Sequence, residues 1–284
     1  MNDLTFGIIG CGWLGTALLT KLLELNHQVK VTCQSEHSKQ QLLLKTHNIE
    51  QLTFPLQADR ILEIEARSFK LEVLNQNIVV ICIPPKFRLN SDYPQHIQQL
   101  VHLCELHSVQ HVIMISTTSI YTGLSGNVDE STPLHFSDEK VNLLYQAEQY
   151  IRGFSRHSTI LRVAGLVGDD RHPSRFMNPN KISTDAINPI NLVHQKDVVN
   201  LILKASNVSL NNNNSSQTFN VVSNTHCSKQ SFYQNAAKSQ NRPIPEFSSA
   251  QTQPARIVCS VKSRELLNYQ YQVEDLNLWL TNQN

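Results

Sequence analysis

The chain of 284 residues is expected to form a doubly wound α/β structure built on a parallel sheet. Two patterns indicate this architecture. Apolar runs of strand length, such as residues 77–83 and 111–116, lack the alternation of a half-exposed strand, which is typical of parallel strands buried on both faces. Segments with apolar residues at helical spacing separate these runs, as expected when helices connect and cover such strands.

The expected elements follow one another along most of the chain. Pro84 and Pro85 end the strand at 77–83, because proline cannot donate a hydrogen bond to a sheet. The expected strands are residues 4–9, 28–33, 77–83, 111–116, 158–164 and 218–222, and the expected helices are residues 13–25, 97–107, 140–153 and 197–205.

The composition excludes several classes of partner. The chain has 24 Lys and Arg against 23 Asp and Glu, so charge favours neither nucleic acid nor an anionic membrane. Its apolar runs are shorter than the roughly 18 residues of a membrane span. The first residues, Met1–Leu4, lack the basic start of a secretory signal. We expect a cytoplasmic protein whose partner is a small molecule.

The six cysteines do not indicate a metal site. None stands in a Cys-x-x-Cys pair, and no pair of histidines has zinc spacing. At least three lie in apolar runs, where cysteine packs as a small apolar residue. We expect reduced core cysteines and no bound metal.

The most specific local motif is Gly10-x-Gly12-x-x-Gly15, which follows the first strand directly and precedes the first helix. In that context Gly10 permits a tight turn, Gly12 lets the backbone approach a pyrophosphate, and Gly15 permits close helix–strand packing. The helix N-terminus then offers N–H groups to phosphates. This predicts a Rossmann-type dinucleotide site whose first contacts are Gly10, Cys11, Gly12, Trp13, Leu14 and Gly15.

The end of the second strand bears on the choice between NAD and NADP. An acidic residue that binds the ribose 2′-hydroxyl of NAD is expected about 20 residues after the glycines. The strand ends Cys33-Gln34-Ser35 instead, Glu36 lies in the following loop, and Lys39 is near enough to meet a 2′-phosphate. We therefore favour NADP over NAD by a narrow margin. The further cofactor contacts expected are Gln34, Ser35, Ile83, Pro84, Pro85, Ser116 and Arg162.

No Gly/Ser-rich linker divides the chain. We expect residues 1–165 to form the NAD(P)-binding domain. Residues 166–284 are expected to form a small mixed lobe that binds substrate and returns segments to the core of the sheet.

Four ordered segments carry a family resemblance over nearly the whole chain. Residues 115–121 (Ile-Ser-Thr-Thr-Ser-Ile-Tyr), 129–133, 161–168 and 191–198 resemble the extended short-chain dehydrogenase/reductases, the NAD-dependent epimerase/dehydratase group. The glycine motif with Trp13 and Leu14, together with residues 164–168 and 171–176, resembles the YeeZ-like subgroup of atypical members.

The resemblance implies a mechanism with one departure. In the family a Tyr, activated by a Lys four residues later, moves a proton, a Ser or Thr holds the same oxygen, and the nicotinamide takes the hydride. Thr117 matches the Ser/Thr position. Aligning Glu148 with the family's glutamate puts Lys140 in the Tyr place and Leu144 in the Lys place, whereas Tyr145 has Gln149 as its fourth neighbour. The dyad is absent, and the catalytic candidates are Thr117, Tyr145 and Lys140.

The second half of the chain supplies the substrate candidates. Arg171, His172 and Arg175 follow the strand at 158–164, and arginine suits a phosphate or carboxylate. Thr118 and His194 are further candidate substrate contacts. Arg162, which lies on the strand itself, is another candidate for binding an anionic group. Asp197 is expected to cap the following helix. Thr118-Ser119 replaces the acidic pair of the sugar dehydratases, which disfavours a dehydratase.

These observations predict an NAD(P)-dependent oxidoreductase or epimerase that acts on a small polar substrate of the nucleotide-sugar type. The missing dyad keeps open an alternative, a non-catalytic NAD(P)-binding regulator or sensor. The sequence leaves the oligomeric state open, with a homodimer as one alternative.

Overall fold

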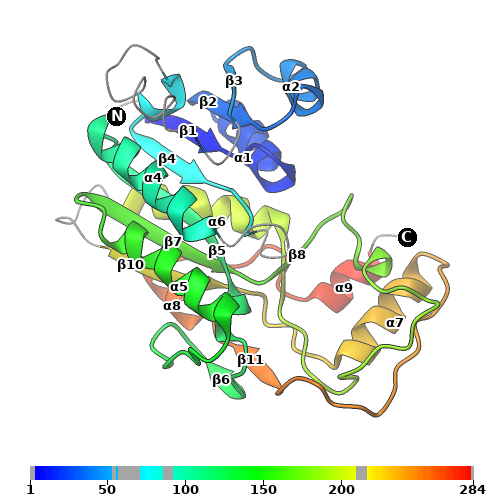
Figure 1. The fold of residues 1–284 in the computed structure, drawn as a ribbon. Helices are drawn as coiled ribbons and strands as arrows, with labels where there is room; N and C mark the ends of the chain where they lie inside the picture. Colours follow the sequence, from blue (N-terminus) through cyan, green and yellow to red (C-terminus); the bar gives the residue numbers. More distant parts are fainter. Residues whose placement is uncertain (1–3, 53–55, 57–70, 86–91, 209–215, 283–284) are drawn as a thin grey trace. The chain divides into compact units, whose positions relative to one another are not determined.

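The computed structural model describes residues 4–52, 56, 71–85, 92–208 and 216–282. Its main sheet has the strand order β10-β7-β5-β4-β1-β2-β3 (Figure 1). The pairings of β1 with β2 and β4, of β2 with β3 and of β4 with β5 are parallel. The strands are β1 (Thr5–Ile9), β2 (Gln28–Cys33), β3 (Ile49–Gln51), β4 (Ile78–Ile81), β5 (His111–Thr117), β7 (His157–Val163) and β10 (Ser216–Val221).

The strand order reverses between β1 and β4, so that the chain winds outward in both directions from this point. A ligand of an open α/β sheet binds beyond the carboxyl ends of the strands at such a reversal. The predicted doubly wound architecture is confirmed, and the reversal places the expected cofactor site after β1.

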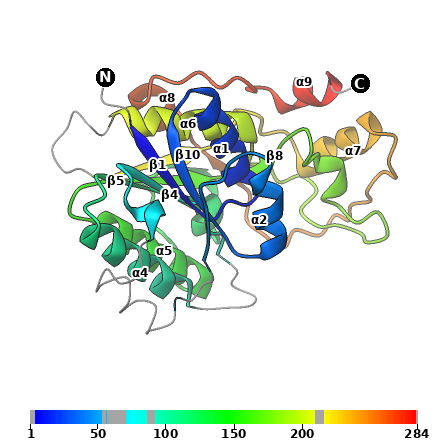
Figure 2. The ribbon, with the colours of Figure 1, turned by 90° about the horizontal axis from the view of Figure 1, so that it is seen from above.

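The helices are α1 (Trp13–Glu24), α2 (Glu36–Leu43), α4 (Tyr93–Leu106), α5 (Glu139–Arg152), α6 (Gln195–Val208), α7 (Lys229–Ser239), α8 (Val261–Leu266) and α9 (Leu276–Thr281). The four predicted helices, which correspond to α1, α4, α5 and α6, begin and end close to their predicted limits. Helix α4 starts four residues before the predicted 97, because Pro94 fits the first turn of a helix. Helix α1 lies on one face of the sheet and α4 and α5 on the other (Figure 2).

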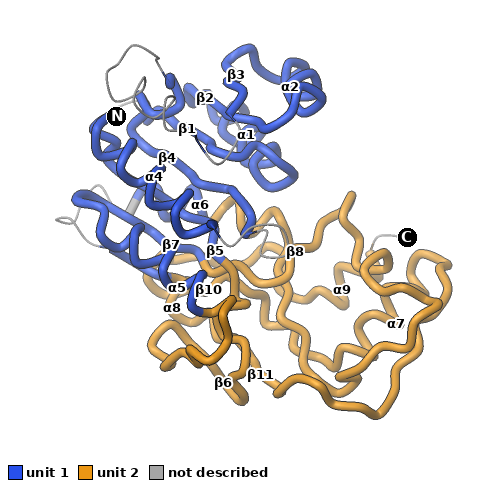
Figure 3. The backbone as a smooth tube through the Cα atoms, viewed as in Figure 1, with its two compact units in different colours: residues 1–116, 142–161, 202–218 blue, residues 117–141, 162–201, 219–284 orange. Residues whose placement is uncertain are grey.

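The described chain divides into two compact units (Figure 3). The first comprises residues 1–116, 142–161 and 202–218, and the second comprises residues 117–141, 162–201 and 219–284. The chain therefore enters each unit more than once. The predicted boundary after residue 165 does not coincide with the limits of these units.

The first unit has its core in the central strands. Every residue of β4 is fully buried, as are Ile8 and Ile9 of β1. This all-apolar burial is what the uninterrupted strand patterns predicted.

The second unit contains two small parallel pairs, β8 (Gly165–Val167) with β9 (Leu192–His194), and β6 (Gly126–Val128) with β11 (Arg256–Val258). A separate apolar cluster joins β8 and β9 to α7 and α9. Its members are Val167, Ile190, Leu192, Phe232, Ala236, Leu276, Trp279 and Leu280.

None of the described helices is long and apolar enough to cross a membrane. All six cysteines lie in the described residues, and none forms a disulfide.

Candidate functional site

The turn between β1 and α1 has the geometry that the glycine motif predicts. Gly10 has a φ of +91°, a conformation that side chains rarely adopt. A Cβ atom added to Gly15 would lie 2.8 Å from the carbonyl oxygen of Gly10, so this helix can approach the turn only with glycine there. A Cβ atom added to Gly12 would meet nothing within 4 Å. Gly12 thus faces open space, as a backbone cradle for a ligand requires.

Thr32 of β2 holds this turn in place. Its Oγ1 accepts a hydrogen bond from the N–H of Gly10 at 3.1 Å, and its carbonyl oxygen accepts one from the N–H of Cys11 at 2.8 Å. Thr32 is buried, so water does not compete for these bonds. The glycine turn is therefore anchored to the neighbouring strand before any ligand binds.

The N-terminus of α1 begins at the same turn. Gly12 is its N-cap, no side chain caps the helix, and its first turn holds no acidic residue. The helix dipole places partial positive charge at this end, where N–H groups have no partner within the helix. An anion next to Gly12 would be stabilised by both effects.

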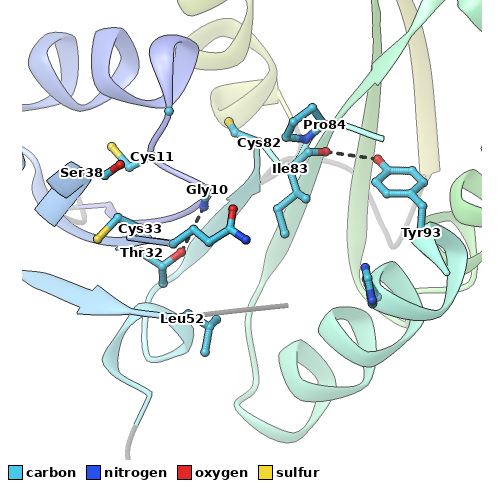
Figure 4. Close-up of a pocket in the computed structure, with 13 residues that line it drawn as sticks. Gly10, Cys11, Thr32, Cys33, Ser38, Leu52, Cys82, Ile83, Pro84 and Tyr93 are labelled. Atoms are coloured by element: carbon cyan, nitrogen blue, oxygen red, sulfur yellow. Dashed lines mark hydrogen bonds between the residues drawn. The ribbon is translucent and has the colours of Figure 1, made fainter. Parts of the chain in front are cut away.

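A cavity of about 500 Å³ opens beside this turn within the first unit (Figure 4). Its walls come from the turn itself, from the ends of β2 and β4, from the first turn of α2, from the residue after β3 and from the start of α4. The lining residues are Gly10, Cys11, Gly12, Thr32, Cys33, Gln34, Ser38, Leu52, Cys82, Ile83, Pro84, Tyr93 and His96.

Six of the predicted cofactor residues line this cavity, namely Gly10, Cys11, Gly12, Gln34, Ile83 and Pro84. Trp13, Leu14 and Gly15 form the first turn of α1. Ser35 is the N-cap of α2, and Pro85 follows the lining residue Pro84. The structure therefore brings most of the predicted cofactor residues to one place.

The motif alone did not identify Thr32, Cys33, Ser38, Leu52, Cys82, Tyr93 or His96. Cys33, Leu52 and Cys82 end or follow strands, so the rule that ligands bind at strand ends would have found them. Tyr93 and His96 come from the start of α4, and no sequence signal singled them out.

No carboxylate stands at the end of β2. Glu36 lies in the first turn of α2, where its carboxylate is 3.8 Å from the Nζ of Lys39. The Oγ of Ser35 accepts a hydrogen bond from the N–H of Ser38, and the two hydroxyl oxygens lie 2.9 Å apart. This end of the cavity offers the Gln34 amide and the Ser38 hydroxyl, and Ser35 and Lys39 are their neighbours in the chain.

The three cysteines of the cavity are neutral thiols. Burial raises the pKa of Cys11 to about 11, and burial also raises the pKa of Cys33. Burial is the main cause of the raised pKa of Cys82 as well. Thiols held in this way are weak nucleophiles, so they serve as apolar lining.

Ser116, a predicted cofactor contact, belongs to a buried chain of polar groups. Its Oγ donates to Oε1 of Glu148 at 2.8 Å, and Nη2 of Arg152 donates to Oε2 of the same carboxylate at 2.9 Å. Glu148 is fully buried. The carboxylate of Glu148 is therefore held at both oxygens inside the first unit.

The predicted catalytic residues lie on two elements, Thr117 at the end of β5 and the other two on α5. Thr117, half-buried at the end of β5, accepts a hydrogen bond from the N–H of Ser119 and so caps a short 3-10 turn, Thr118–Tyr121. Lys140 and Tyr145 are both half-buried on α5. Five residues separate them, which is about 140° around a helix, so they point to different sides. Leu144, in the family's lysine place, is fully buried.

Arg162, expected to meet the cofactor or an anionic substrate, is buried in the second unit. Its Nη1 donates to the hydroxyl oxygen of Tyr121 at 2.8 Å, and that hydroxyl donates to Oδ1 of Asn220 at 2.9 Å. Burial raises the pKa of Tyr121, against the opposing effect of the Arg162 charge. The guanidinium is thus engaged in a buried network.

The other substrate candidates divide into exposed and buried groups. Arg171 and Arg175 are exposed, with Nε of Arg171 donating to the Leu166 carbonyl at 3.2 Å. Thr118, His172 and His194 are buried. The rings of His172 and His194 lie 5.5 and 5.1 Å from the ring of Trp279, and burial lowers the pKa of both histidines.

Asp197 lies inside the first turn of α6, so the expectation that it caps this helix was wrong. Its carboxylate accepts hydrogen bonds from the Tyr269 hydroxyl and from the N–H groups of Gln272 and Val273. It fixes a distant segment of the second unit instead.

Residues 10–207 match the family model described as NAD(P)H-binding. The chain belongs to this family. The matched range includes the glycine turn and most of the chain. The residues present fit a dinucleotide, because the turn is preformed by Thr32 and space lies open at Gly12.

Relatives of this NAD(P)H-binding protein cover almost its full length. Protein YeeZ of Escherichia coli K12 is 27% identical over 273 residues, which is 94% of this chain and 96% of the relative.

Two solved structures have the same fold. MoeE5 in complex with UDP-glucose and NAD superposes with a TM-score of 0.78 at 18% identity, over 98% of this chain and 97% of that one. The UDP-glucuronic acid 4-epimerase of Bacillus cereus, in complex with NAD, gives 0.72 at 18% identity, over 96% and 95%. This chain thus shares its fold with these two NAD-bound proteins.

Proposed function

We propose that this protein is an NAD(P)-dependent oxidoreductase or epimerase of the atypical extended type, acting on a small polar substrate of the nucleotide-sugar class. The observation that carries the proposal is the cavity at the glycine turn, anchored by Thr32 and open at Gly12. A bound nicotinamide would supply hydride transfer at its C4 atom. The chain's own part is to bind, orient and move protons.

The contacts within the cavity have separate roles in this proposal. The N–H groups at the start of α1 would hold the pyrophosphate, and the apolar lining at Leu52, Ile83 and Pro84 would exclude water from the cofactor. Thr117, with its hydroxyl hydrogen-bonded to Ser119, would hold the reacting oxygen of the substrate. Lys140 or Tyr145 would have to move the proton.

The substrate class rests on two supports. Two proteins of similar fold bind UDP-glucose or act on UDP-glucuronic acid, as their names state. In this chain Arg171 and Arg175 are exposed on one short segment, and their guanidinium groups match the geometry of phosphate oxygens. A diphosphate-linked sugar would use both. His194, Thr118 and His172 lie in the same unit and would act through neighbouring side chains, because they are buried.

The cofactor proposed is NADP in preference to NAD. The end of β2 has no carboxylate to accept hydrogen bonds from the hydroxyl groups of an NAD ribose, and Glu36 lies beyond it in the first turn of α2. Gln34, Ser35, Ser38 and Lys39 would instead donate to a 2′-phosphate.

The test combines binding with turnover. Titration of the protein with NADPH and NADH measures both dissociation constants, and incubation with a panel of UDP- and dTDP-sugars, followed at 340 nm and by chromatography, detects reduction or epimerisation. The proposal of an enzyme is supported if the wild type binds the cofactor and converts any member of the panel, and if Thr117→Ala loses that turnover. Tight binding with no change in any substrate argues against it.

A second function, a non-catalytic NAD(P)-binding regulator, is favoured by one observation. Leu144 is fully buried where the family places its catalytic lysine, so no cation activates a tyrosine from that position. This alternative requires dinucleotide binding, and it requires that Thr117→Ala leave the cellular phenotype of the gene intact. Loss of the phenotype in a folded Thr117→Ala protein would contradict it.

A further inference from the structure

The cavity contains one phenol that no motif predicted. Tyr93, the first residue of α4, lines the cavity with Ile83 and Pro84, and the residue is only 3% exposed (Figure 4). Its hydroxyl donates to the carbonyl oxygen of Ile83 at 3.4 Å. Because hydroxyl hydrogen bonds are usually about 2.7–2.8 Å long, this bond is weak. A stronger acceptor in the cavity would accept the hydrogen bond of the phenol in place of this carbonyl at little cost.

The surroundings keep this phenol protonated. Burial raises the pKa of Tyr93, and the negative charge of Glu148 raises it further. Glu148 itself cannot turn away, because Ser116 and Arg152 hold its two oxygens. Tyr93 therefore keeps its proton and is available as a hydrogen-bond donor.

A protonated donor fits the chemistry of a dinucleotide. The oxygens of its phosphates and riboses accept hydrogen bonds, and the opposite wall of the same cavity consists of the glycine turn, whose backbone suits phosphate. A hydrogen bond from a neutral donor to a charged oxygen is stronger than one to a backbone carbonyl. The phenol would thus gain by exchanging Ile83 for the ligand.

We propose that Tyr93 is a dinucleotide-binding residue, whose hydroxyl leaves the carbonyl of Ile83 and donates to a phosphate or ribose oxygen of the bound cofactor. This inference rests on the proposed function. It adds a contact from α4 to the contacts that the glycine turn and β2 supply.

The experiment compares two tyrosine-to-phenylalanine variants of the full chain. Tyr93→Phe removes only the hydroxyl from the cavity, and Tyr150→Phe makes the same change on α5 at a half-buried residue that does not line it. Fluorescence titration with NADPH should show binding weakened about tenfold in Tyr93→Phe and unchanged in Tyr150→Phe. Thermal unfolding of each protein reports whether it is folded.

A series of shorter ligands locates the contacted oxygen. A loss that Tyr93→Phe shows equally with NADPH, ADP-ribose and AMP places the contact on the adenylate. A loss that begins with ADP-ribose places it on the far phosphate or its ribose, and a loss with NADPH alone places it on the nicotinamide side. Each pattern supports the proposal, and equal affinity of wild type and Tyr93→Phe for all three ligands overturns it.

The outcome separates this inference from the proposed function. If the wild type binds none of the ligands, both fail, whereas normal binding by Tyr93→Phe removes only the role of Tyr93. A crystal structure of the wild-type complex gives a measurement without any variant. A Tyr93 hydroxyl still bonded to Ile83, with no cofactor oxygen within hydrogen-bond distance, contradicts the proposal even if Tyr93→Phe fails to fold.

Discussion

The guanidinium of Arg162 donates from Nη1 to the hydroxyl oxygen of Tyr121 at 2.8 Å, and both side chains are almost fully buried. The Arg162 guanidinium carbon also lies 5.2 Å from the centre of the Tyr121 ring. A buried charge is costly unless it is paired or hydrogen-bonded. The arrangement indicates that Arg162 acts on the stability of the second unit.

Tyr121→Phe should therefore destabilise the protein without affecting its cofactor. Removing the hydroxyl takes one acceptor from Arg162 and one donor from Asn220, which should lower the free energy of unfolding by about 1–3 kcal/mol. Urea unfolding measures this change, and NADPH titration should give the wild-type dissociation constant. A loss of affinity with unchanged stability would show that Arg162 and Tyr121 serve the ligand instead.

The glycines of the turn should separate ligand binding from folding. Gly12→Val projects a side chain into open space, so we expect a wild-type melting temperature and NADPH binding weakened at least tenfold. Gly15→Ala brings a methyl group to 2.8 Å from a backbone oxygen, and overpacking of this kind costs about 1–3 kcal/mol of stability. Calorimetry and titration of both variants provide the comparison. Normal NADPH binding by Gly12→Val would place the pyrophosphate elsewhere.

The residue after β2 should determine the choice of cofactor. Gln34 lines the cavity, and Gln34→Asp would supply the carboxylate that binds the two hydroxyl groups of an NAD ribose and repels a 2′-phosphate. We expect NADPH to bind at least tenfold more weakly and NADH more tightly. Gln41→Asp, an exposed residue of α2, makes the same charge change as a control. An unchanged ratio of the two dissociation constants would remove Gln34 from the adenosine site.

His111 should make the protein sensitive to acid. This histidine is fully buried on β5 with its Nε2 2.9 Å from Oγ1 of Thr159, and burial, helped by the nearby His157, lowers its pKa from 6.5 to about 3. The unfolded chain binds the proton below pH 6.5 while the folded chain does not, so stability falls as the pH decreases from 6.5 toward 3. The total loss is roughly 5 kcal/mol by the conversion of about 1.4 kcal/mol per pKa unit.

Urea unfolding between pH 7 and pH 4 measures this effect. The His111→Gln variant should lose less stability than the wild type as the pH falls, although it is less stable at pH 7. His47→Gln, at an exposed histidine, is the control and should keep the wild-type slope. Equal slopes for wild type and His111→Gln would mean that His111 is protonated in the folded protein.

Local patterns in the sequence were sufficient for the architecture and for the centre of the cofactor site. The uninterrupted run at 77–83 became the buried strand β4, and Gly10, Gly12 and Gly15 formed the expected turn. Both depend on neighbours in the chain, because a strand buried on both faces needs continuous apolar residues and a tight turn needs glycine. The buried strand and the glycine turn each depend on a segment of only about ten residues.

Only the tertiary structure decided what the polar side chains do. Arg162 and Tyr121 are 41 residues apart, and Asp197 binds the segment around Gln272, 75 residues away. Tyr93 joins the cavity because α4 packs where β4 ends, and nothing in its local sequence marks it. Hydrophobic periodicity determines which face of an element is buried, but the partner of a buried polar group depends on how distant elements pack. The sequence by itself therefore determined the α/β fold and the glycine turn, and packing decided which polar residues border the cavity.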